Sequence, residues 1–493
     1  MTLDVLMVAA EAVPLAKTGG LGDVVGALAP ALSEAGVSVT LMLPGYPAAL
    51  AVADPQPIAC LDNLPGGPAT LLRGVLPGSD VPVLLLRNDA LFARDGTLYA
   101  DAEGREHPDN PLRFGALCHA AARVAAGLPG LPRFGLVHAH DWHAGLVPLL
   151  MREAGVTARS VFTIHNLAFQ GNYPKEWMAR IGIPAHACDA AGVEFWAQLS
   201  FMKAGLVYAD RLTTVSPRYA REILTEAAGC GMEGVLGERA HVLRGIRNGI
   251  DTALWNPATD QALPTAFTAG DPAGKHTCKA ALQRRFGLPE DAFAPMVALG
   301  SRLTHQKMAD VALQALPSLL NRHPRLQVAV LGCGQPEYER GFRALQQTLP
   351  RRVAVHIGYS EELAHLLHAG ANVLLHGSRF EPCGLAPLYS MRYGTIPVAS
   401  RVGGLADTIV DPAEHDPQHA PANGFLFDGA APEAMVEAVE RALAAFAQPK
   451  VWRQLQRNAM SAELGWQAAV PEYLALYRDL LGHAVDDLHQ ATA

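Results

Sequence analysis

Residues 4–43 read DVLMVAAEAVPLAKTGGLGDVVGALAPALSEAGVSVTLML and contain the pattern of a strand, a helix and a second strand. The apolar run Asp4 to Ala10 predicts the first strand. Residues Val24 to Ala35 predict a helix that ends at Gly36, and the β-branched run Val37 to Leu43 predicts the second strand. A strand, a crossover helix and a parallel strand form the right-handed unit of α/β proteins. The start of the chain therefore predicts a parallel sheet covered by helices.

The same alternation continues through the first half of the chain and restarts in the second half. Further short strands are predicted at Val81 to Leu86, Gly135 to Ala139, Ser160 to Ile164 and Arg211 to Val215. After a connection rich in Pro, Thr and Ala from Asn256 to Gly274, strands are predicted at Met296 to Gly300, Leu326 to Gly332, Val353 to Ile357, Asn372 to Leu375 and Thr395 to Ala399. The stretch Trp452 to Leu481 has a helical pattern. This order predicts two successive doubly wound α/β domains, whose ligands bind beyond the carboxyl ends of the strands.

The composition of the 493 residues narrows the classes of function. Hydrophobic residues make up 50% and charged residues 17%, which is typical of a globular protein with large buried cores. Lys and Arg number 39 against 47 for Asp and Glu, and a net charge of −8 argues against an extended nucleic-acid surface. The seven cysteines include no CxxC pair, so neither a disulfide framework nor a cysteine zinc site is indicated.

The first residues, MTLDVLMVAAEAVP, do not have the form of a signal peptide. Asp4 stands where a basic residue would be needed, and Glu11 interrupts the apolar run early. The rest of the sequence has no stretch of about 18 uncharged apolar residues, the length that a membrane helix needs. We therefore expect a soluble protein of the reducing cytoplasm, with no membrane partner.

A glycine-rich turn follows the first predicted strand. It reads Lys17-Thr18-Gly19-Gly20-Leu21-Gly22-Asp23 and leads into the first helix. Glycines allow the backbone to approach a ligand, and the amides at a helix start attract anions. The turn is neither a Walker loop, because Lys17 precedes the glycines, nor a Rossmann fingerprint, because its glycines are spaced GxGxxxG. Packing of the helix against the strand explains such a turn equally well.

The histidine-rich run His138 to His143 has the density of a metal site but not its spacing. Binuclear metallohydrolases use HxHxDH, which would require Asp at the position of Trp142, so we expect polar groups that line the end of a strand and no metal. The run Glu361 to His368 lacks HExxH order and predicts a solvated helix face. His165 ends the next strand, where a histidine is well placed to meet a substrate.

The second predicted domain carries charged residues at its strand ends. Arg302 and Lys307 follow its first strand, and two fixed cations in a cleft suit a departing diphosphate, although two solvated surface cations are equally possible. Glu381 precedes a predicted helix, where a carboxylate can accept hydrogen bonds from sugar hydroxyls. Cys383 has no accompanying His and Asp pattern, so a buried or incidental thiol is favoured over a nucleophile.

Taken together, these residues resemble the bacterial glycogen synthase and plant starch synthase family. The matching motifs follow the family's order over most of the chain: Lys17 to Val24 (KTGGLGDV), His138 to Gly145 (HAHDWHAG), Phe162 to Gly171 (FTIHNLAFQG), Ser200 to Ala209 (SFMKAGLVYA), Asn248 to Asp251 (NGID), Ser301 to Lys307 (SRLTHQK), Ser378 to Leu385 (SRFEPCGL) and Gly403 to Thr408 (GGLADT). The first and the penultimate motifs are the most specific.

The resemblance implies a GT-B glycosyltransferase, with two Rossmann-like doubly wound parallel-sheet domains that face each other across a cleft. Residues 1–245 would form the domain on the acceptor side, residues 246–463 the nucleotide-sugar domain, and residues 464–493 a helical segment that returns to the first domain. The implied reaction transfers glucose from ADP-glucose to the 4-hydroxyl at the non-reducing end of an α-1,4-glucan, glycogen or a maltooligosaccharide, with retention of configuration. No metal or other cofactor is expected.

The resemblance also implies roles for individual residues. Arg302 and Lys307 would hold the diphosphate, and Glu381 the transferred glucose. His165 would position the glucosyl unit through its ring and its backbone carbonyl, and Tyr359 would pack on the adenine. Further substrate-binding positions implied by the resemblance are Lys17, Gly19, Gly20, Asp23, Asp141, Asn248, Cys383, Gly384 and Leu385.

A front-face mechanism fits the family, in which the leaving diphosphate oxygen takes the acceptor proton while the two cations bear the charge. A covalent intermediate through Glu381 is the weaker alternative. Three positions depart from the family pattern: Met308 replaces a Gly, Ala386 replaces a Thr, and Trp196 replaces a smaller or polar residue. Rival readings are a nucleotide-sugar or glucan-binding protein with weak catalysis, the same transfer from UDP-glucose, and a glycogen phosphorylase, whose pyridoxal phosphate lysine motif is not found.

Overall fold

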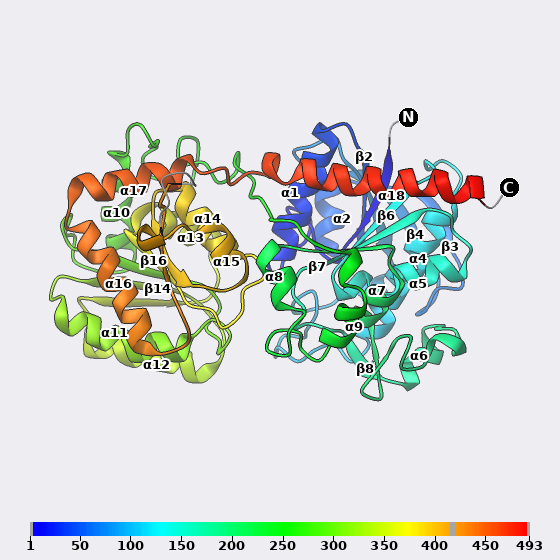
Figure 1. Ribbon diagram of the computed structural model, residues 1–493, viewed down its shortest axis with the longest axis horizontal. Coiled ribbons are helices and arrows are strands. Elements are labelled where there is room, and N and C mark those ends of the chain that lie inside the picture. Colours follow the sequence, from blue (N-terminus) through cyan, green and yellow to red (C-terminus); the bar gives the residue numbers. More distant parts are fainter. Residues whose placement is uncertain (1–2, 415–420, 491–493) are drawn as a thin grey trace. The chain divides into compact units, whose positions relative to one another are not determined.

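The computed structural model describes residues 3–414 and 421–490, and within them it has two compact α/β units (Figure 1). Unit 1 runs up to Gly249 and resumes at Trp466, and unit 2 spans Ile250–Gly465. The two-domain α/β fold that the sequence predicts is confirmed. The predicted domain ranges include residues 1–2, 415–420 and 491–493, which lie outside the described residues.

Unit 1 is built on a nine-stranded sheet in the order β12-β11-β7-β6-β1-β2-β5-β4-β3. Its strands, in the order of the chain, are β1 (Asp4–Val8), β2 (Ser38–Pro44), β3 (Gln56–Leu61), β4 (Ala69–Val75), β5 (Pro82–Arg87), β6 (Leu136–His140), β7 (Arg159–Ile164), β11 (Arg211–Thr214) and β12 (Leu243–Gly245). The central strand β1 pairs in parallel with β2 and β6, with Val5 opposite Val39 and Leu136. Because helices cover both faces of a parallel sheet, β1 is buried from Val5 to Val8, and β6 is buried along its whole length, including its two histidines.

One edge of this sheet differs from the prediction of a purely parallel sheet. Strand β4 pairs antiparallel with both β5 and β3, so the sheet is mixed. The sequence analysis predicted neither β3 nor β4. Strand β3 opens with Gln56 and Pro57 and keeps most of its side chains out of the core, so it lacks the apolar run that marks the inner strands. The antiparallel edge changes no predicted site residue.

The helices of unit 1 are α1 (Gly20–Glu34), α2 (Pro47–Ala53), α3 (Asp89–Phe92), α4 (Asn110–Ala126), α5 (Val147–Glu153), α6 (Glu176–Arg180), α7 (Phe201–Tyr208), α8 (Pro217–Glu222), α9 (Glu233–Glu238) and α18 (Val470–Gln490). A separate antiparallel sheet has the order β8-β10-β9, formed by β8 (Asn172–Pro174), β9 (Glu194–Phe195) and β10 (Gln198–Ser200). It follows directly on the loop after β7, and β8 is labelled in Figure 1.

Unit 2 contains a six-stranded sheet, all parallel, in the order β15-β14-β13-β16-β17-β18. Its strands are β13 (Met296–Gly300), β14 (Gln327–Gly332), β15 (Val353–Ile357), β16 (Val373–His376), β17 (Ile396–Ser400) and β18 (Phe425–Phe427). Its helices are α10 (Gly274–Arg285), α11 (Ala309–Arg322), α12 (Pro336–Thr348), α13 (Glu361–Gly370), α14 (Leu385–Arg392), α15 (Gly403–Thr408), α16 (Pro432–Phe446) and α17 (Pro449–Ser461).

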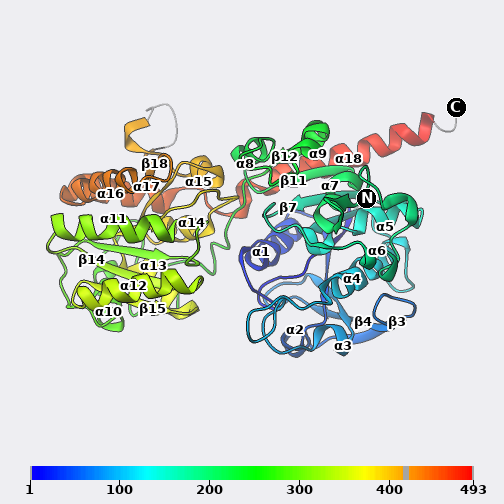
Figure 2. The same ribbon diagram turned by 90° about the horizontal axis from the view of Figure 1, so that it is seen from below.

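The helices of unit 2 form two groups. Helix α11 contacts α12 and α16, while α13 contacts α10 and α14, and Figure 2 shows helices on both faces of the sheet. From β13, the chain first adds strands on one side of the sheet (β14, β15) and then on the other (β16, β17, β18). The carboxyl ends of β13 and β16 therefore lie side by side at the switch point, where doubly wound sheets bind ligands.

The helical pattern from Trp452 to Leu481 predicted a helical stretch, but this stretch is interrupted. Helix α17 ends at Ser461, a short 3-10 turn occupies Trp466–Ala468, and α18 begins at Val470. Helix α18 packs on unit 1, where the hydroxyl of Tyr477 bonds the ring of His138 in β6 at 2.7 Å. The break separates a helix of unit 2 from a helix of unit 1.

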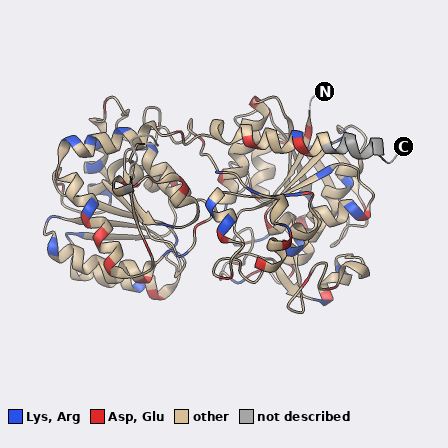
Figure 3. Ribbon diagram, viewed as in Figure 1, with Lys and Arg blue, Asp and Glu red and all other residues tan. Residues whose placement is uncertain are grey.

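Acidic and basic residues are interspersed on the helices of each unit (Figure 3). Among the described residues, no helix is both long enough and apolar enough to cross a bilayer. All seven cysteines are free thiols, as the sequence predicts.

Candidate active site

The glycine-rich turn of unit 1 lies between β1 and α1 and is held by a buried acid. Glu11 accepts hydrogen bonds through Oε2 from the backbone amides of Thr18 at 2.6 Å and Gly19 at 3.1 Å. The hydroxyl of Tyr99 donates to the other oxygen of the same carboxylate. Burial raises the pKa of Glu11 above its usual value. The Glu11 carboxylate therefore fixes the backbone of the turn from the protein interior, while residues Lys17 to Gly20 remain exposed to solvent.

Lys17 forms an ion pair with Asp23, with Nζ 2.9 Å from Oδ1. Asp23 lies in the first turn of α1, and Gly19 and Gly20 are exposed at the start of this helix. The helix comes close to the preceding loop because Gly26 has no side chain, since a Cβ there would lie 2.4 Å from the carbonyl oxygen of Val13. A glycine of α1 therefore permits the close packing, while the turn itself has an exposed face next to the cation of Lys17.

Asp141 follows β6 in the left-handed region, with φ 58°. Its side chain is buried, and burial raises its pKa to about 8, although backbone amides of Asn166, His165 and Trp142 act against the rise. Within the described residues, Oδ1 of Asp141 has no hydrogen-bond partner. A strained, buried and incompletely bonded acid of this kind is typical of a functional position.

His165 directly follows β7, the strand that pairs with β6. Its Nε2 lies 2.9 Å from Nδ1 of His140, and burial lowers its pKa to about 3, so the ring is neutral at physiological pH. Asn248 is also buried in unit 1, with Oδ1 lacking a hydrogen-bond partner among the described residues. His165 and Asp141 thus follow the ends of two adjacent strands, β7 and β6.

The sequence pattern predicted that the run His138 to His143 lines the end of a strand. Its three histidines instead lie in the interior of unit 1. His138, His140 and His143 are buried, and His143 stacks on Tyr99 with ring centroids 4.6 Å apart. In the part of the chain that the structure describes, no group of three or more His, Cys, Asp or Glu residues could hold a metal ion.

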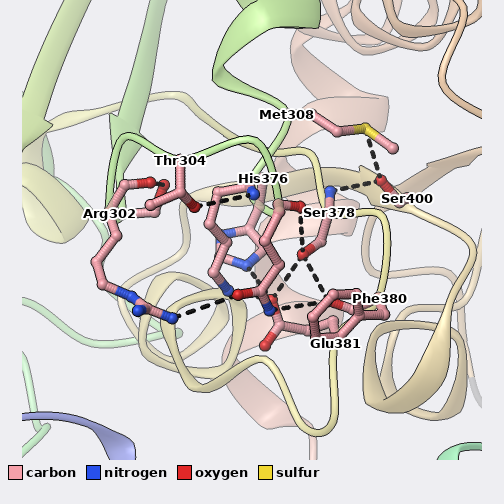
Figure 4. Close-up of polar contacts among 11 residues, drawn as sticks. Arg302, Thr304, Met308, His376, Ser378, Phe380, Glu381 and Ser400 are labelled. Carbon is pink, nitrogen blue, oxygen red and sulfur yellow. Dashed lines mark hydrogen bonds and ion pairs between the residues drawn. The ribbon is translucent and has the colours of Figure 1, made fainter. Parts of the chain in front are cut away.

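In unit 2, Glu381 (labelled in Figure 4) and Lys307 form a largely buried ion pair in the loops that follow β16 and β13. The ammonium group of Lys307 contacts Oε2 of Glu381. The same oxygen lies 3.2 Å from Nε2 of His376 and accepts a hydrogen bond from the hydroxyl of Ser378 at 3.1 Å. Four polar side chains therefore converge at the carboxyl end of β16.

The charge of this cluster follows from its contacts. Burial alone would raise the pKa of Glu381, but the charge of Lys307 and the hydrogen bond from His376 outweigh burial and hold this pKa far below its usual value. Burial, together with the Lys307 charge, lowers the pKa of His376, so its ring stays neutral. Glu381 is thus ionised across the physiological range, in a place where an unpaired acid would be neutral.

Arg302 and Tyr359 follow β13 and β15, the two strands of unit 2 that flank β14. Arg302 is exposed after β13, and its guanidinium lies 3.4 Å from Oε1 of Gln306 (Figure 4). Tyr359 follows β15, is 68% exposed, and donates its hydroxyl to Glu361. An exposed aromatic ring at the carboxyl end of a parallel strand is well placed to stack on a flat ligand.

The loop that contains Cys383, Gly384 and Leu385 packs against the next glycine-rich turn. Gly404 donates its backbone N–H to the carbonyl of Glu381 at 3.0 Å. A Cβ on Gly404 would lie 2.3 Å from the carbonyl oxygen of Cys383, so only glycine permits this approach. Cys383 is buried, and Leu385 starts α14. The loop therefore holds the backbone of Glu381 next to a helix start.

Met308 follows Lys307 in the left-handed region, with φ 52°. Glycine adopts this conformation freely, whereas another residue loses about 1–2 kcal/mol in it. The side chain is buried, with its sulfur 3.6 Å from the hydroxyl of Ser400. Packing therefore holds Met308 in the backbone conformation that a glycine would adopt at this position.

The predicted site residues fall into two sets, one in each unit. Unit 1 holds Lys17, Gly19, Gly20, Asp23, Asp141, His165 and Asn248. Unit 2 holds Arg302, Lys307, Tyr359, Glu381, Cys383, Gly384 and Leu385.

The sequence suggested no role for four further residues: Glu11, His376 and Ser378 contact members of these sets, and Tyr99 contacts Glu11. Glu11 interrupts an apolar run and His376 ends a buried strand, and both are signals that a sequence reading could use. Tyr99 lies 88 residues from its partner Glu11, so no local pattern connects them.

Comparison with known proteins identifies both halves of the chain. A family described as the starch synthase catalytic domain matches residues 4–238, and a family described as glycosyl transferases group 1 matches residues 283–459.

Similar proteins match over nearly the full length. The glycogen synthase of Ralstonia nicotianae is 59% identical over 490 residues, which cover 99% of this chain and 90% of the relative. The glycogen synthase of Bordetella petrii is 54% identical over 97% of this chain and 92% of its own. The catalytic domain of starch synthase IV from Arabidopsis thaliana, solved bound to ADP and acarbose, is 30% identical with a TM-score of 0.89, covering 97% of this chain and 99% of that domain.

These matches cover both α/β units, including the strand ends that carry the predicted site residues. The chain belongs to the glycogen synthase and starch synthase family, glycosyltransferases of the GT-B fold that transfer glucose to an α-1,4-glucan.

Proposed function

We propose that this chain transfers glucose from ADP-glucose to the 4-hydroxyl at the non-reducing end of an α-1,4-glucan, glycogen or a maltooligosaccharide, with retention of the anomeric configuration. The observation that carries the proposal is the buried Lys307–Glu381 pair, with His376 and Ser378 on the same carboxylate oxygen. A permanently ionised acid at a ligand-binding strand end suits the recognition of sugar hydroxyls.

The donor is assigned to unit 2. Arg302 and Lys307 hold the diphosphate and bear the charge that develops as it leaves, and Tyr359 stacks on the adenine. Cys383, Gly384 and Leu385 bring backbone amides at the start of α14 to the phosphates. The starch synthase IV domain is bound to ADP, the leaving group of ADP-glucose, which supports the adenine donor over UDP-glucose.

Glu381 binds the transferred glucose rather than forming a bond to it. Three groups converge on Oε2, so we assign Oε1 to a hydroxyl of the sugar. A carboxylate whose pKa is held so low is a weak nucleophile, and this argues against a covalent intermediate.

The acceptor and the reacting sugar are assigned to unit 1. His165, neutral at physiological pH, positions the glucosyl unit through its ring and backbone carbonyl, and Asp141 and Asn248 contribute polar contacts. Lys17, Gly19 and Gly20 contact the donor's phosphates or sugar, and Asp23 supports their turn through its ion pair with Lys17.

In the reaction, the bond from the anomeric carbon to the phosphate oxygen breaks and a bond to the acceptor O4 forms on the same face. The acceptor proton passes from O4 to the leaving phosphate oxygen. The cations Arg302 and Lys307 stabilise the charge of this oxygen, so the proposal includes no resident metal or other cofactor. We further propose a cytoplasmic location, which the free cysteines support.

The variants Glu381→Gln and Lys307→Met test the role of the ion pair. Each is expected to lower kcat for glucose transfer by about 10²–10³, because each removes a charged contact to the reacting groups. The matched control is Glu290→Gln, which breaks an exposed pair with Arg284 and should leave kcat unchanged. Normal kcat in a folded Glu381→Gln variant would contradict the assignment.

Stability separates loss of chemistry from loss of fold. Lys307→Met leaves the Glu381 carboxylate buried without its cation, a change that costs about 3–5 kcal/mol. The double variant Lys307→Met/Glu381→Gln should recover most of this stability without recovering transfer. Recovery of both would show that the pair is only structural.

A further inference from the structure

We propose that Trp196 and Phe169 form an acceptor track on unit 1, in which the ring of Trp196 stacks against a glucose unit of the α-1,4-glucan behind its reacting end. The inference rests on the proposed transfer to such a glucan. It adds a binding position for the acceptor to those proposed for His165, Asp141 and Asn248.

The exposure of Trp196 is unusual. The side chain is 80% exposed, although tryptophan is a large apolar residue that proteins normally cover. Trp196 and Ala197 form the two-residue turn between β9 and β10, with φ values of 50° and 60°. Hairpin turns with two positive φ values favour Asn and Gly, so a tryptophan here is unfavourable for the turn itself. A side chain that costs the turn stability and is left in solvent indicates a binding role.

The turn is fixed firmly on the unit. Glu194 accepts a hydrogen bond from the backbone N–H of Ala197. The buried ammonium of Lys203 donates to the carbonyls of Glu194 at 2.6 Å and Ala190 at 2.5 Å. Phe195 packs edge-on against Trp196, with ring centroids 6.1 Å apart. The indole ring is therefore presented on a rigid support, which lowers the entropy cost of binding.

A chain of contacts joins this turn to the loop that follows His165. A Cβ on Gly231 would lie 3.2 Å from the Phe195 ring and 3.6 Å from the indole nitrogen of Trp196. The preceding residue, Cys230, accepts a hydrogen bond at its carbonyl from the side chain of Gln170 at 3.0 Å. The hydroxyl of Ser200, at the end of β10, donates to the Gln170 carbonyl. The aromatic hairpin is thus anchored to the segment that carries His165.

Phe169 is a second exposed aromatic residue on the same loop as His165, next to the Gln170 that contacts Cys230 and Ser200. It is about half exposed, precedes Gln170 and lies four residues after His165. The apolar C–H faces of glucose units stack well on aromatic rings, and a glucan repeats such faces along its length. A polymer made of these units therefore fits the track better than a nucleotide, whose phosphates would need cations.

The test compares Trp196→Ala with Phe293→Ala, a matched control in unit 2 whose aromatic ring is 79% exposed. Binding of maltoheptaose and of ADP is measured separately by calorimetry, and KM is measured with maltose and with maltoheptaose. Trp196→Ala should weaken maltoheptaose binding and raise its KM by roughly fivefold, the size expected for one lost aromatic contact. ADP binding and kinetics with maltose should not change, and Trp196→Tyr should restore most of the affinity.

Two results would overturn the inference. The first is unchanged maltoheptaose affinity in Trp196→Ala, or an equal loss in Phe293→Ala. The second is a loss of ADP affinity as large as the loss of maltoheptaose affinity, which would show that Trp196 meets something other than the glucan. If the unmodified chain transferred no glucose, the proposed function would fail, while calorimetry would still decide whether Trp196 binds glucan.

Discussion

Two buried carboxyl groups, those of Asp141 and Glu381, have pKa values shifted in opposite directions, because only Glu381 has a cation beside it. Burial raises the pKa of Asp141 to about 8, while the ammonium of Lys307 reverses the effect of burial on Glu381. The sequence could predict Glu381 and Lys307 because each lies in a local motif, but their mutual contact joins positions 74 residues apart. His376 stayed unpredicted because a single histidine at a strand end has no distinctive spacing.

Asp141 should make stability depend on pH. Its pKa is about 3.9 in an unfolded chain and about 8 in the folded protein, so the folded state binds the extra proton between these values. Stability therefore falls as pH rises from about 4 to 8, by up to about 1.4 kcal/mol per pH unit. Relative to the unmodified chain, Asp141→Asn should gain stability progressively from pH 5 to pH 8. Chemical denaturation at several pH values measures this gain, and a constant difference across the window would contradict the account.

A buried lysine, Lys275, joins three helices of unit 2. Lys275 in α10 donates to the carbonyl of Ala369 in α13 at 2.8 Å, the carbonyl of Tyr393 after α14 at 2.9 Å, and the hydroxyl of Thr395 at 2.7 Å. Burial lowers its pKa to about 7. A single side chain thus satisfies carbonyl groups at the ends of two helices, where helix carbonyls lack partners.

Lys275→Met should lower the free energy of unfolding by about 2–4 kcal/mol, because it leaves at least two buried carbonyls without a donor. Lys450→Met, at an exposed position in α17, is the control and should change stability little. Urea denaturation measures both. ADP affinity of the folded Lys275→Met variant should remain unchanged, and a stability equal to that of the control would refute this role of Lys275.

Strands were easier to predict than helix faces. The strands Met296–Gly300 and Val353–Ile357 have the bounds that the sequence predicted, because buried parallel strands are short apolar runs. The helix face at Glu361 to His368 was predicted to be solvated, and this is wrong for His365 and His368. Both are buried, and His365 stacks on Trp255 with ring centroids 4.0 Å apart. A partner more than 100 residues away in the sequence leaves no local signal.

At the scale of the whole molecule, each unit carries one half of the proposed chemistry. The residues proposed to hold the diphosphate and the adenine lie in unit 2, whereas the glycine-rich turn, His165 and the acceptor track lie in unit 1. The chain passes between the units twice, at Gly249 and at Gly465, and in unit 2 the N–H of Ile250 bonds the carbonyl of Leu464 at 2.8 Å. The sequence predicted two domains because the alternation of strands and helices restarts in the second half. It could not predict that the two connecting segments contact each other, because Ile250 and Leu464 are 214 residues apart.

The central claim is the transfer of glucose from ADP-glucose to a glucan by this full-length chain. The most direct measurement is incorporation of labelled glucose into glycogen by the purified protein, with ADP-glucose and UDP-glucose supplied separately and EDTA present. We expect rapid transfer from ADP-glucose that EDTA does not reduce, because Arg302 and Lys307 stabilise the leaving diphosphate. Transfer from UDP-glucose alone would contradict the donor assignment, and no transfer from either donor, with glycogen binding retained, would contradict the central claim.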